Sequence, residues 1–340
     1  MRWQYYQYGW HWKQIKIIGM KRTSKLLVSG LTIIRNGVRL NYPFIEAIRS
    51  VLPICDEYIV VAGDSEDETL EYLAALDSEK VRVVHTEWSP LVRPQKCLLA
   101  QQTNIGLGFC RGRWCLNLQG NEVIHEKDLP RLRQLMETHA DNESVEAMLV
   151  ERLTFWSDYD HYIAVYPRRF KYTARIIRPH IGTYSIRDGM SFAVFDNFST
   201  RGRYPSALDT GVDLYRYDYV HSVEQQARKF ADAVHRSGTS VRAGQDYFYT
   251  HYPRQFIARF GGSHPATMAD RVDSSEQRNR LDLGKCRIQL SSGERKRLLE
   301  SSIYSRFGLP KLSRNRFKLI GSLLEKERPK LGALDGTLKL

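Results

Sequence analysis

The sequence predicts an α/β fold, with a mostly parallel β-sheet that helices cover on both faces. Short apolar segments without a helical period alternate, over the first half of the chain, with segments whose apolar residues recur at helical spacing. Polar or flexible residues follow these apolar segments, as they do where a buried strand leaves its sheet. The length of 340 residues allows one large domain with additions, or two domains.

The predicted elements alternate along residues 26–153. The first strand, LLVSGLTII at 26–34, is broken by Arg35-Asn36-Gly37. The first helix, 41–51, has Asn41 as a candidate cap, an early proline and apolar residues at helical spacing. The remaining strands are the apolar segments at 57–61, 81–84, 114–118 and 146–153, and the remaining helices lie at 69–76, 101–109 and 127–139.

The pattern changes after about residue 154. Residues 154–222 are aromatic and irregular, with short extended pieces, and further helices are predicted at 223–235 and 254–260. We interpret this region as an acceptor-side lobe of the same domain and not as a separate fold. The chain then divides into a basic aromatic N-terminal extension, an α/β half, the acceptor-side half and a basic, partly helical C-terminal extension: 1–24, 25–153, 154–270 and 271–340.

The formal net charge of +13 is concentrated at the two ends of the chain. Residues 1–25 contain six lysines or arginines and no acidic residue, interleaved with tryptophan and tyrosine. Such a segment is either a disordered or loosely docked terminus, or it lies on a membrane surface rich in anionic lipid; a natural start at Met20 is a third alternative. The sequence contains no RNP-like, zinc-finger or helix-turn-helix pattern, so nucleic acid is not an expected partner.

The cysteines and the hydropathy pattern indicate a compartment. The five cysteines form no CxxC pair and no metal-ligand spacing, which is typical of reduced thiols in a cytoplasmic protein. No apolar run approaches the ~20 residues that span a bilayer, and the N-terminus has no signal-peptide core. We expect a cytoplasmic protein, with the basic ends allowing peripheral contact with the inner face of the membrane.

Four loops follow the predicted strands and should meet at one edge of the sheet. They are Arg35-Asn36, residues 63–67, the segment around Trp88 and residues 119–122. In parallel α/β sheets, ligands bind outside the carboxyl ends of the strands. The sequence therefore predicts a ligand site formed by these loops.

Two of the loops carry candidate ligand groups. Asp64 and Asp67 precede a predicted helix, so capping explains them, but their carboxylates could equally accept from a base N–H or a ribose hydroxyl. Gln119, Asn121 and Glu122 supply oxygens around a short turn, the ligand type that Mg²⁺ or Mn²⁺ prefers. An ordinary strand-to-helix loop is the alternative for this turn.

A third candidate lies in the second half of the chain. Asp188 occurs in SIRDGMSF, close to Arg178 and Arg187. Its two interpretations are a structural ion pair and a general base, which requires hydrogen-bond reach of the attacking hydroxyl. The sequence contains no GxSxG elbow and no P-loop, and GLGFCRG does not follow a strand as a dinucleotide fingerprint would.

The order of several motifs resembles the bacterial family-2 glycosyltransferases, which have the GT-A fold. The motifs are Arg35-Asn36, DEYIVVAGDSEDETLE at 56–71, QTNIGLGFCRGRWCLNLQGNEVIHE at 102–126, LTFWSDYDHY at 153–162, ARIIRPHIGTYSIRDGMSF at 174–192 and FYTHYPRQFIARFGGSHPATM at 248–268. Within the family the chain is similar to a branch whose strand-end motif reads Gln-Ala-Asp-Glu. The resemblance covers roughly residues 25–270.

The resemblance implies a nucleotide-sugar donor, usually bound with Mn²⁺ or Mg²⁺. The donor nucleotide would contact Arg35, Asn36, Asp64, Asp67 and Asn104; the metal and diphosphate would contact Gln119, Asn121 and Glu122; Arg178 and Arg187 would contact the diphosphate or the acceptor; and Asp188 would be the base. The family implies an inverting transfer to a saccharide or lipid-linked saccharide, in surface polysaccharide synthesis.

The sequence departs from the family pattern at two positions. Asn121 stands where an Asp is expected, and Ala62-Gly63 replaces the usual Asp after the second strand. Both changes remove negative charge from the donor site. They leave a second hypothesis open, in which a related protein binds a nucleotide or saccharide without turnover. A nucleotidyltransferase shares the architecture, but no glycine-rich triphosphate loop is present.

Overall fold

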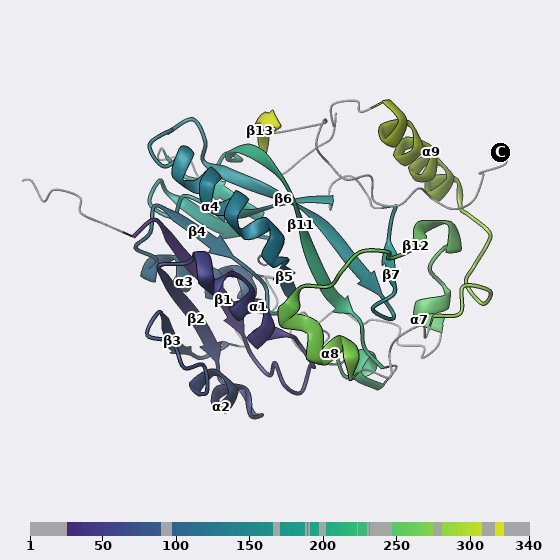
Figure 1. The fold of residues 1–340 in the computed structure, drawn as a ribbon, viewed down its shortest axis with the longest axis horizontal. Helices are drawn as coiled ribbons and strands as arrows, with labels where there is room; N and C mark the ends of the chain where they lie inside the picture. The colour runs from purple at the N-terminus through teal and green to yellow at the C-terminus, as the bar shows by residue number, and fades with distance from the viewer. Residues whose placement is uncertain are drawn as a thin grey trace, which may run out of the picture.

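The computed structural model describes most of the chain between residues 26 and 322. Figure 1 shows the parallel strands of the N-terminal half at one end and helix α9 at the other. The described residues are 26–89, 97–165, 171–187, 189, 191–196, 202–222, 224–229, 231, 247–274, 281–307 and 317–322. The predicted N-terminal extension, 1–24, lies outside them.

Four consecutive strands form the parallel part of the central sheet. β1 (Val28–Ile34) lies between β2 (Glu57–Gly63) and β4 (Trp114–Asn117), and β3 (Val81–Thr86) pairs with β2, all in parallel register. β1, β2 and β4 are buried on both faces, which is why they read as continuous apolar runs. Their carboxyl ends therefore meet at one edge.

The second half of the chain extends the same sheet. β8 (Tyr172–Ile177) is antiparallel to both β4 and β6 (Ala147–Trp156), so β6 runs in the direction of β1–β4. The long strand β11 (Ser206–Tyr219) lies parallel to β6. The other strands are β5 (Glu122–Ile124), antiparallel to β11; β13 (Lys318–Ser322), parallel to β11; β7 (His161–Ile163) with β12 (Ile257–Arg259); and the separate hairpin of β9 (Thr183–Ile186) and β10 (Ser191–Val194).

Helices cover both faces of the parallel strands. α1 (Phe44–Val51), α2 (Thr69–Ala74) and α4 (Leu129–Thr138) pack in the apolar cluster that contains Tyr58, while α3 (Leu98–Phe109) packs on the other face against Leu31. The remaining described helices are α7 (Tyr247–Thr250), α8 (Ala269–Asp273), which lies beside α1 in Figure 1, and α9 (Ser292–Phe307). Short 3-10 turns occur at Leu52–Ile54, Glu126–Asp128, Arg254–Phe256 and Ala266–Met268. The predicted α/β fold class, with a mostly parallel sheet and helices on both faces, is confirmed.

The structure differs from the sequence prediction in the second half of the chain. The helix predicted at 254–260 is wrong: a 3-10 turn at Arg254–Phe256 leads into β12, because residues 257–259 pair with β7. The region predicted as irregular contributes five strands, of which β8 lies inside the sheet. The C-terminal extension also contributes a strand, β13. Of the helix predicted at 223–235, the described residues 224–229 and 231 are helical.

Candidate functional site

A cavity of about 350 Å³ lies at the carboxyl ends of β1 and β4. We call it the strand-end cavity. Its described lining residues come from the ends of β1 and β4, the segment between β1 and α1, the segment after β3, helix α3, strand β11 and helical residues 224–229. They are Ile33, Ile34, Arg35, Leu40, Tyr42, Trp88, Leu99, Gln119, Gly120, Asn121, Arg216, Asp218 and Lys229. The loops predicted to converge from the first, third and fourth strands do so here.

A more open hollow of about 600 Å³ lies at the carboxyl ends of β2 and β3. Asp64 and Glu66 contribute to it, together with Thr86 and Glu87 from the end of β3. Arg35 joins the two spaces: it lines the strand-end cavity and its Nε donates to Asp64 Oδ1 and to the Asp64 carbonyl, both at 3.1 Å. Arg35 Nη2 also pairs with Glu66 Oε1 at 3.0 Å.

Asp64 keeps an accessible carboxylate despite its partners. The side chain is 50% exposed, whereas that of Arg35 is 9% exposed. The backbone N–H of Trp88 donates to Asp64 Oδ1 at 3.2 Å, so Asp64 holds the segment after β3 against the end of β1. The accessible part of this carboxylate faces the hollow and is able to accept from a hydroxyl or a ring N–H.

Asn36 and Asp67 serve as connectors between the loops after β1 and β2. Asn36 is buried with φ of 52°, a left-handed conformation that Asn tolerates better than most residues. Its Oδ1 accepts from the backbone N–H of Glu66 at 2.8 Å. Asp67 accepts from the backbone N–H groups of Arg39, at 2.7 Å, and Thr69, at 3.2 Å. These contacts are those of a capping residue that also tethers two loops, which is the structural alternative for Asp67.

Gly63 is explained by the close approach of Trp88. A Cβ atom at position 63 would lie 2.5 Å from Trp88 Nε1, which is too close for any side chain. The small residue at the end of β2 therefore allows an indole ring to pack directly on the backbone. The same ring lies under the guanidinium of Arg35, whose Cζ is 5.9 Å from the ring centroid.

Asn121 contacts a carboxylate that the sequence analysis missed. Asn121 Nδ2 donates to Asp218 Oδ1 at 2.6 Å. Asp218 Oδ1 also pairs with Lys229 Nζ at 2.5 Å, and Oδ2 with Arg216 Nη2 at 2.9 Å. Arg216 and Asp218 are two residues apart on β11, so they share one face of the strand. The alternation in LYRYDY was the signal that could have identified them.

The charge of Asp218 is held by its neighbours. Burial alone would raise the pKa of this carboxyl, but the positive charges of Arg216 and Lys229 outweigh burial and hold its pKa well below the ordinary value. Asp218 is therefore an anion throughout the neutral range. Asp218 and its two cationic partners, Arg216 and Lys229, form one cluster on the wall of the strand-end cavity.

Glu122 lies behind the cavity and not on its wall. It is completely buried, and its Oε1 accepts from Arg175 Nη2 at 2.6 Å while its Oε2 accepts from the backbone N–H of Gln119 at 3.0 Å. Burial would raise its pKa, but the nearby charges of Arg175, Arg152 and Arg216 lower it. Of the turn predicted to hold a metal, Gln119 and Asn121 line the cavity and Glu122 is part of a buried ion pair.

The described residues around the strand-end cavity do not fit a divalent cation. Their one carboxylate, Asp218, is bonded through both oxygens, to a lysine, an arginine and an amide. The carboxylate of Glu122 is paired with Arg175. Among the described residues no group of three or more His, Cys, Asp or Glu side chains is placed to hold a metal. The described residues of this cavity therefore offer no ligand set for the Mn²⁺ or Mg²⁺ expected from the family resemblance.

Arg178 lies at the opposite edge of the sheet, because β8 is antiparallel to its neighbours. The end of β8 at Ile177 is level with the first residues of β4 and β6. Arg178 donates to the carbonyls of Val145, Ala140 and His139 at 2.7, 3.0 and 2.6 Å, and its guanidinium lies 4.2 Å from the centre of the Trp114 ring. The structure does not bring Arg178 to the strand-end cavity.

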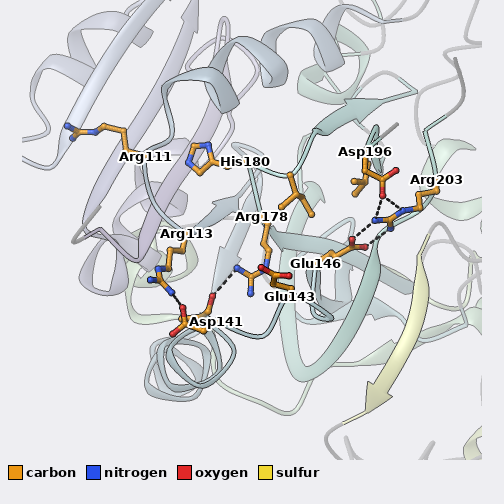
Figure 2. A pocket seen from close by; sticks show the side chains of 12 residues that line it. Arg111, Arg113, Asp141, Glu143, Glu146, Arg178, His180, Asp196 and Arg203 are labelled. Carbon is orange, nitrogen blue, oxygen red and sulfur yellow. Dashed lines mark hydrogen bonds and ion pairs between the residues drawn. The ribbon is translucent and has the colours of Figure 1, made fainter. Parts of the chain in front are cut away.

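Figure 2 shows the cavity to which Arg178 belongs, which we call the opposite-edge cavity. It has a volume of about 750 Å³. Five of its charged lining residues are paired among themselves: Arg203 with Glu146 and Asp196, and Arg113 with Asp141 (Figure 2). This is the larger of the two cavities, but the loops at the carboxyl ends of β1–β4 do not reach it.

The remaining candidates lie around the hairpin β9–β10. The amide of Asn104 on α3 bonds the backbone of Ser185 twice, with Nδ2 donating at 3.1 Å and Oδ1 accepting at 2.7 Å, so it anchors the hairpin. Arg187 is exposed with φ of 54°. A Cβ atom at Gly189 would lie 3.2 Å from Leu99, a lining residue of the strand-end cavity, so this turn is beside that cavity. Asp188 lies outside the described residues.

No family model matches the chain, and no curated protein is similar to it in sequence. Solved structures align over parts of it. S. aureus TarS 1–349 in complex with UDP has a TM-score of 0.32 and 15% identity over 46% of this chain and 47% of that one, so the chain spans about half of its length. Glucosyl-3-phosphoglycerate synthase from Mycobacterium tuberculosis, in complex with Mn²⁺, UDP and glucosyl-3-phosphoglycerate, has a TM-score of 0.36 and 13% identity over 70% and 88%. The 4-diphosphocytidyl-2C-methyl-D-erythritol synthase from Anaerococcus prevotii has 0.29 and 15% over 45% and 70%. Alignments this weak assign no activity to the chain.

Proposed function

We propose that the protein is a glycosyltransferase that takes a sugar from a nucleoside diphosphate sugar and transfers it to a hydroxyl of a saccharide or lipid-linked saccharide. One observation carries the proposal: the loops at the carboxyl ends of β1, β3 and β4 meet at a cavity with cationic side chains, directly beside the hollow of Asp64. Ligands of α/β sheets bind at this edge. The motifs that resemble family-2 glycosyltransferases supply the same loops.

Different parts of the donor occupy the two adjoining spaces. The hollow at the ends of β2 and β3 takes the nucleoside, with Asp64 accepting from a hydroxyl or a base N–H. The strand-end cavity takes the diphosphate, which Arg216 and Lys229 neutralise, and the sugar. Trp88 and Arg35 lie where the two spaces meet. Preorganised cations aimed at a growing negative charge lower the barrier for departure of a diphosphate.

In the transfer step, an acceptor oxygen forms a bond to the anomeric carbon while the bond from that carbon to the diphosphate oxygen breaks. The electron pair leaves with the nucleoside diphosphate, and the hydroxyl proton passes to a base. Attack opposite the leaving group inverts the anomeric carbon. Asp188 remains the candidate base, and a positioned base contributes ~10²–10⁴ in rate. Gly189, one residue later, lies beside the cavity.

The first test is binding. Thermal shift of the full chain against UDP-, GDP-, CMP- and dTDP-sugars should give a stabilisation with one nucleotide class, because a ligand that binds only the native state raises apparent stability. A transfer assay with the stabilising donor and short saccharide acceptors then tests turnover. If none of the nucleotide sugars raises the melting temperature, the proposal is refuted.

A second candidate function is donor or saccharide binding without turnover. The observation that favours it is that the described residues around Asn121 and Asp218 offer no metal ligand set. Nucleotide-sugar binding that is saturable, combined with no transfer and no donor hydrolysis, would favour this candidate over the enzyme.

The place of action is also a proposal. No helix within the described residues is long and apolar enough to cross a membrane. The basic, aromatic residues 1–24 lie outside the described part of the chain, and we propose that they hold the protein at an anionic membrane surface where a lipid-linked acceptor is presented. Sedimentation with anionic, but not neutral, lipid vesicles is the expected result, and it should weaken with salt.

A further inference from the structure

We infer that the side-chain cluster Arg216–Asp218–Lys229 neutralises the donor diphosphate in place of a divalent metal, so that nucleoside diphosphates bind without one. The inference rests on the proposed function.

The cluster is built into the wall of the strand-end cavity. Arg216 and Asp218 lie near the C-terminal end of strand β11, and Lys229 lies in the helical segment 224–229. Asp218 bonds Lys229 Nζ at 2.5 Å and Arg216 Nη2 at 2.9 Å, and Lys229 also donates to the Asp218 carbonyl. Both cations are thereby fixed at one end, while all three side chains line the cavity.

The balance of charge favours an anion over a cation. Two positive groups and one carboxylate leave the cluster with one net positive charge. The third cation on the cavity wall, Arg35, is already paired with Asp64 and Glu66. To bind Asp218, a metal ion would have to displace Arg216 or Lys229. It would then remain close to both side chains, whose positive charges would repel it. A diphosphate instead gains charge-assisted hydrogen bonds from both cations.

The ammonium group of Lys229 is buried and lies close to two aromatic rings. It is 8% exposed, and its ammonium lies 5.5 Å from the centre of the Tyr42 ring and 5.2 Å from that of Tyr219. Ring faces stabilise a cation that has lost part of its hydration. A preorganised cation needs little rearrangement when the diphosphate arrives.

Asn121 is the residue type that this cluster requires. Its Nδ2 donates to Asp218 Oδ1 at 2.6 Å. An aspartate in its place would set two carboxylates against each other at that separation, a repulsion that a bound metal ion or a shared proton would relieve. Asn121 and Asp218, which lies between two cations, thus form one hydrogen-bonded arrangement.

The principal test measures binding of UDP, GDP, CDP and dTDP to the full chain by titration calorimetry, in EDTA and in excess Mn²⁺. For the nucleotide that binds, we expect dissociation constants that differ by less than about threefold between the two conditions. Binding that appears only with Mn²⁺ overturns the inference and leaves the proposed function intact. Binding of none of the four overturns both.

The second test asks whether the cluster contacts the diphosphate. Lys229→Met keeps the aliphatic stem and removes the charge, and it should weaken diphosphate binding in EDTA roughly 10- to 100-fold while changing binding of the parent nucleoside little. Lys296→Met, on the exposed surface of α9, is the matched control. Equal affinities of the folded Lys229→Met and control variants for the diphosphate would overturn the inference.

The third test does not depend on the Lys229 variant. Asn121→Asp should create the paired carboxylates that a metal needs. Mn²⁺ should therefore raise the melting temperature of Asn121→Asp and leave that of the parent unchanged. A parent protein that responds to Mn²⁺ as strongly as the variant contradicts the inference, whether or not any nucleotide is present.

Discussion

The strand-end and opposite-edge cavities use the same residue types in different ways. Among the described lining residues, the opposite-edge cavity has four arginines and four acidic residues, whereas the strand-end cavity has three cationic side chains and one carboxylate. In the first, Arg203 and Arg113 are paired with lining acids, and Arg178 is bonded to backbone carbonyls. In the second, an excess of positive charge faces the cavity. The larger cavity is therefore the weaker candidate for an anionic ligand.

The largest expected effect is a loss of stability when the buried ion pair behind the strand-end cavity is broken. Arg175→Met should lower the free energy of unfolding by about 3–5 kcal/mol, because it leaves the buried Glu122 carboxylate without its closest cation. Urea denaturation of the ligand-free protein measures this. Arg152 and Arg216 also act on Glu122 and would soften the loss. A variant of parental stability that has lost nucleotide binding would show that Glu122 and Arg175 belong to the ligand site instead.

The next effect concerns the seat of Trp88 between the two spaces. Gly63→Ala should cost about 1–3 kcal/mol, because its Cβ would lie 2.5 Å from the indole nitrogen. Trp88→Ala should relieve the clash, so a double-mutant cycle should show strong coupling. Thermal or urea denaturation of the four proteins measures it. Additive effects would mean that the indole is not packed on residue 63.

A pair of arginine substitutions tests the comparison of the cavities directly. Arg178→Met should reduce stability by about 1.5–3 kcal/mol, through lost hydrogen bonds to carbonyls, and leave nucleotide affinity unchanged. Arg216→Met should weaken nucleoside diphosphate binding by about 1.5–3 kcal/mol. Calorimetric titration and urea denaturation of both variants are needed. The comparison fails if Arg178→Met weakens diphosphate binding more than Arg216→Met does.

The smallest effect is a pH dependence of stability close to the cluster. Burial, and then the positive charge of Lys229, lower the pKa of His221 to about 3, although the negative charge of Asp218 acts to raise it. The unfolded chain takes up a proton near pH 6.5 while the native state does not, so stability should fall as pH drops below 6.5. The slope reaches about 1.4 kcal/mol per pH unit for one group. His221→Gln should flatten the curve between pH 6.5 and 5; an unchanged curve would contradict the assignment.

The local elements were predictable because their patterns are local. The apolar runs of β1, β2 and β4, and the helical spacing of α1 and α4, appear in short windows of sequence. The convergence of Arg35, Trp88 and Gln119 followed from the parallel direction of the strands that precede them. The roles of individual polar groups were not predictable, because each depends on a partner distant in the chain. Glu122 meets Arg175, and Asn121 meets Asp218.

The second half of the chain shows the same limit for secondary structure. Residues 257–259 form a strand because β7 offers an edge to pair with, and no window around them contains that information. β8 lies in the region predicted as irregular, and its reversed direction carries Arg178 to the far edge of the sheet.

By itself the sequence determined the α/β class, the alternation of elements and the edge at which ligand groups gather, since hydrophobic periodicity and strand direction are properties of contiguous residues. Only the tertiary structure decided which charged side chains pair with each other. It buried Glu122 against Arg175, set Asp218 between Arg216 and Lys229, and left Asp64 accessible. The physical reason is that the Coulomb energy of a side chain depends on distance and burial in the folded molecule, not on separation along the chain.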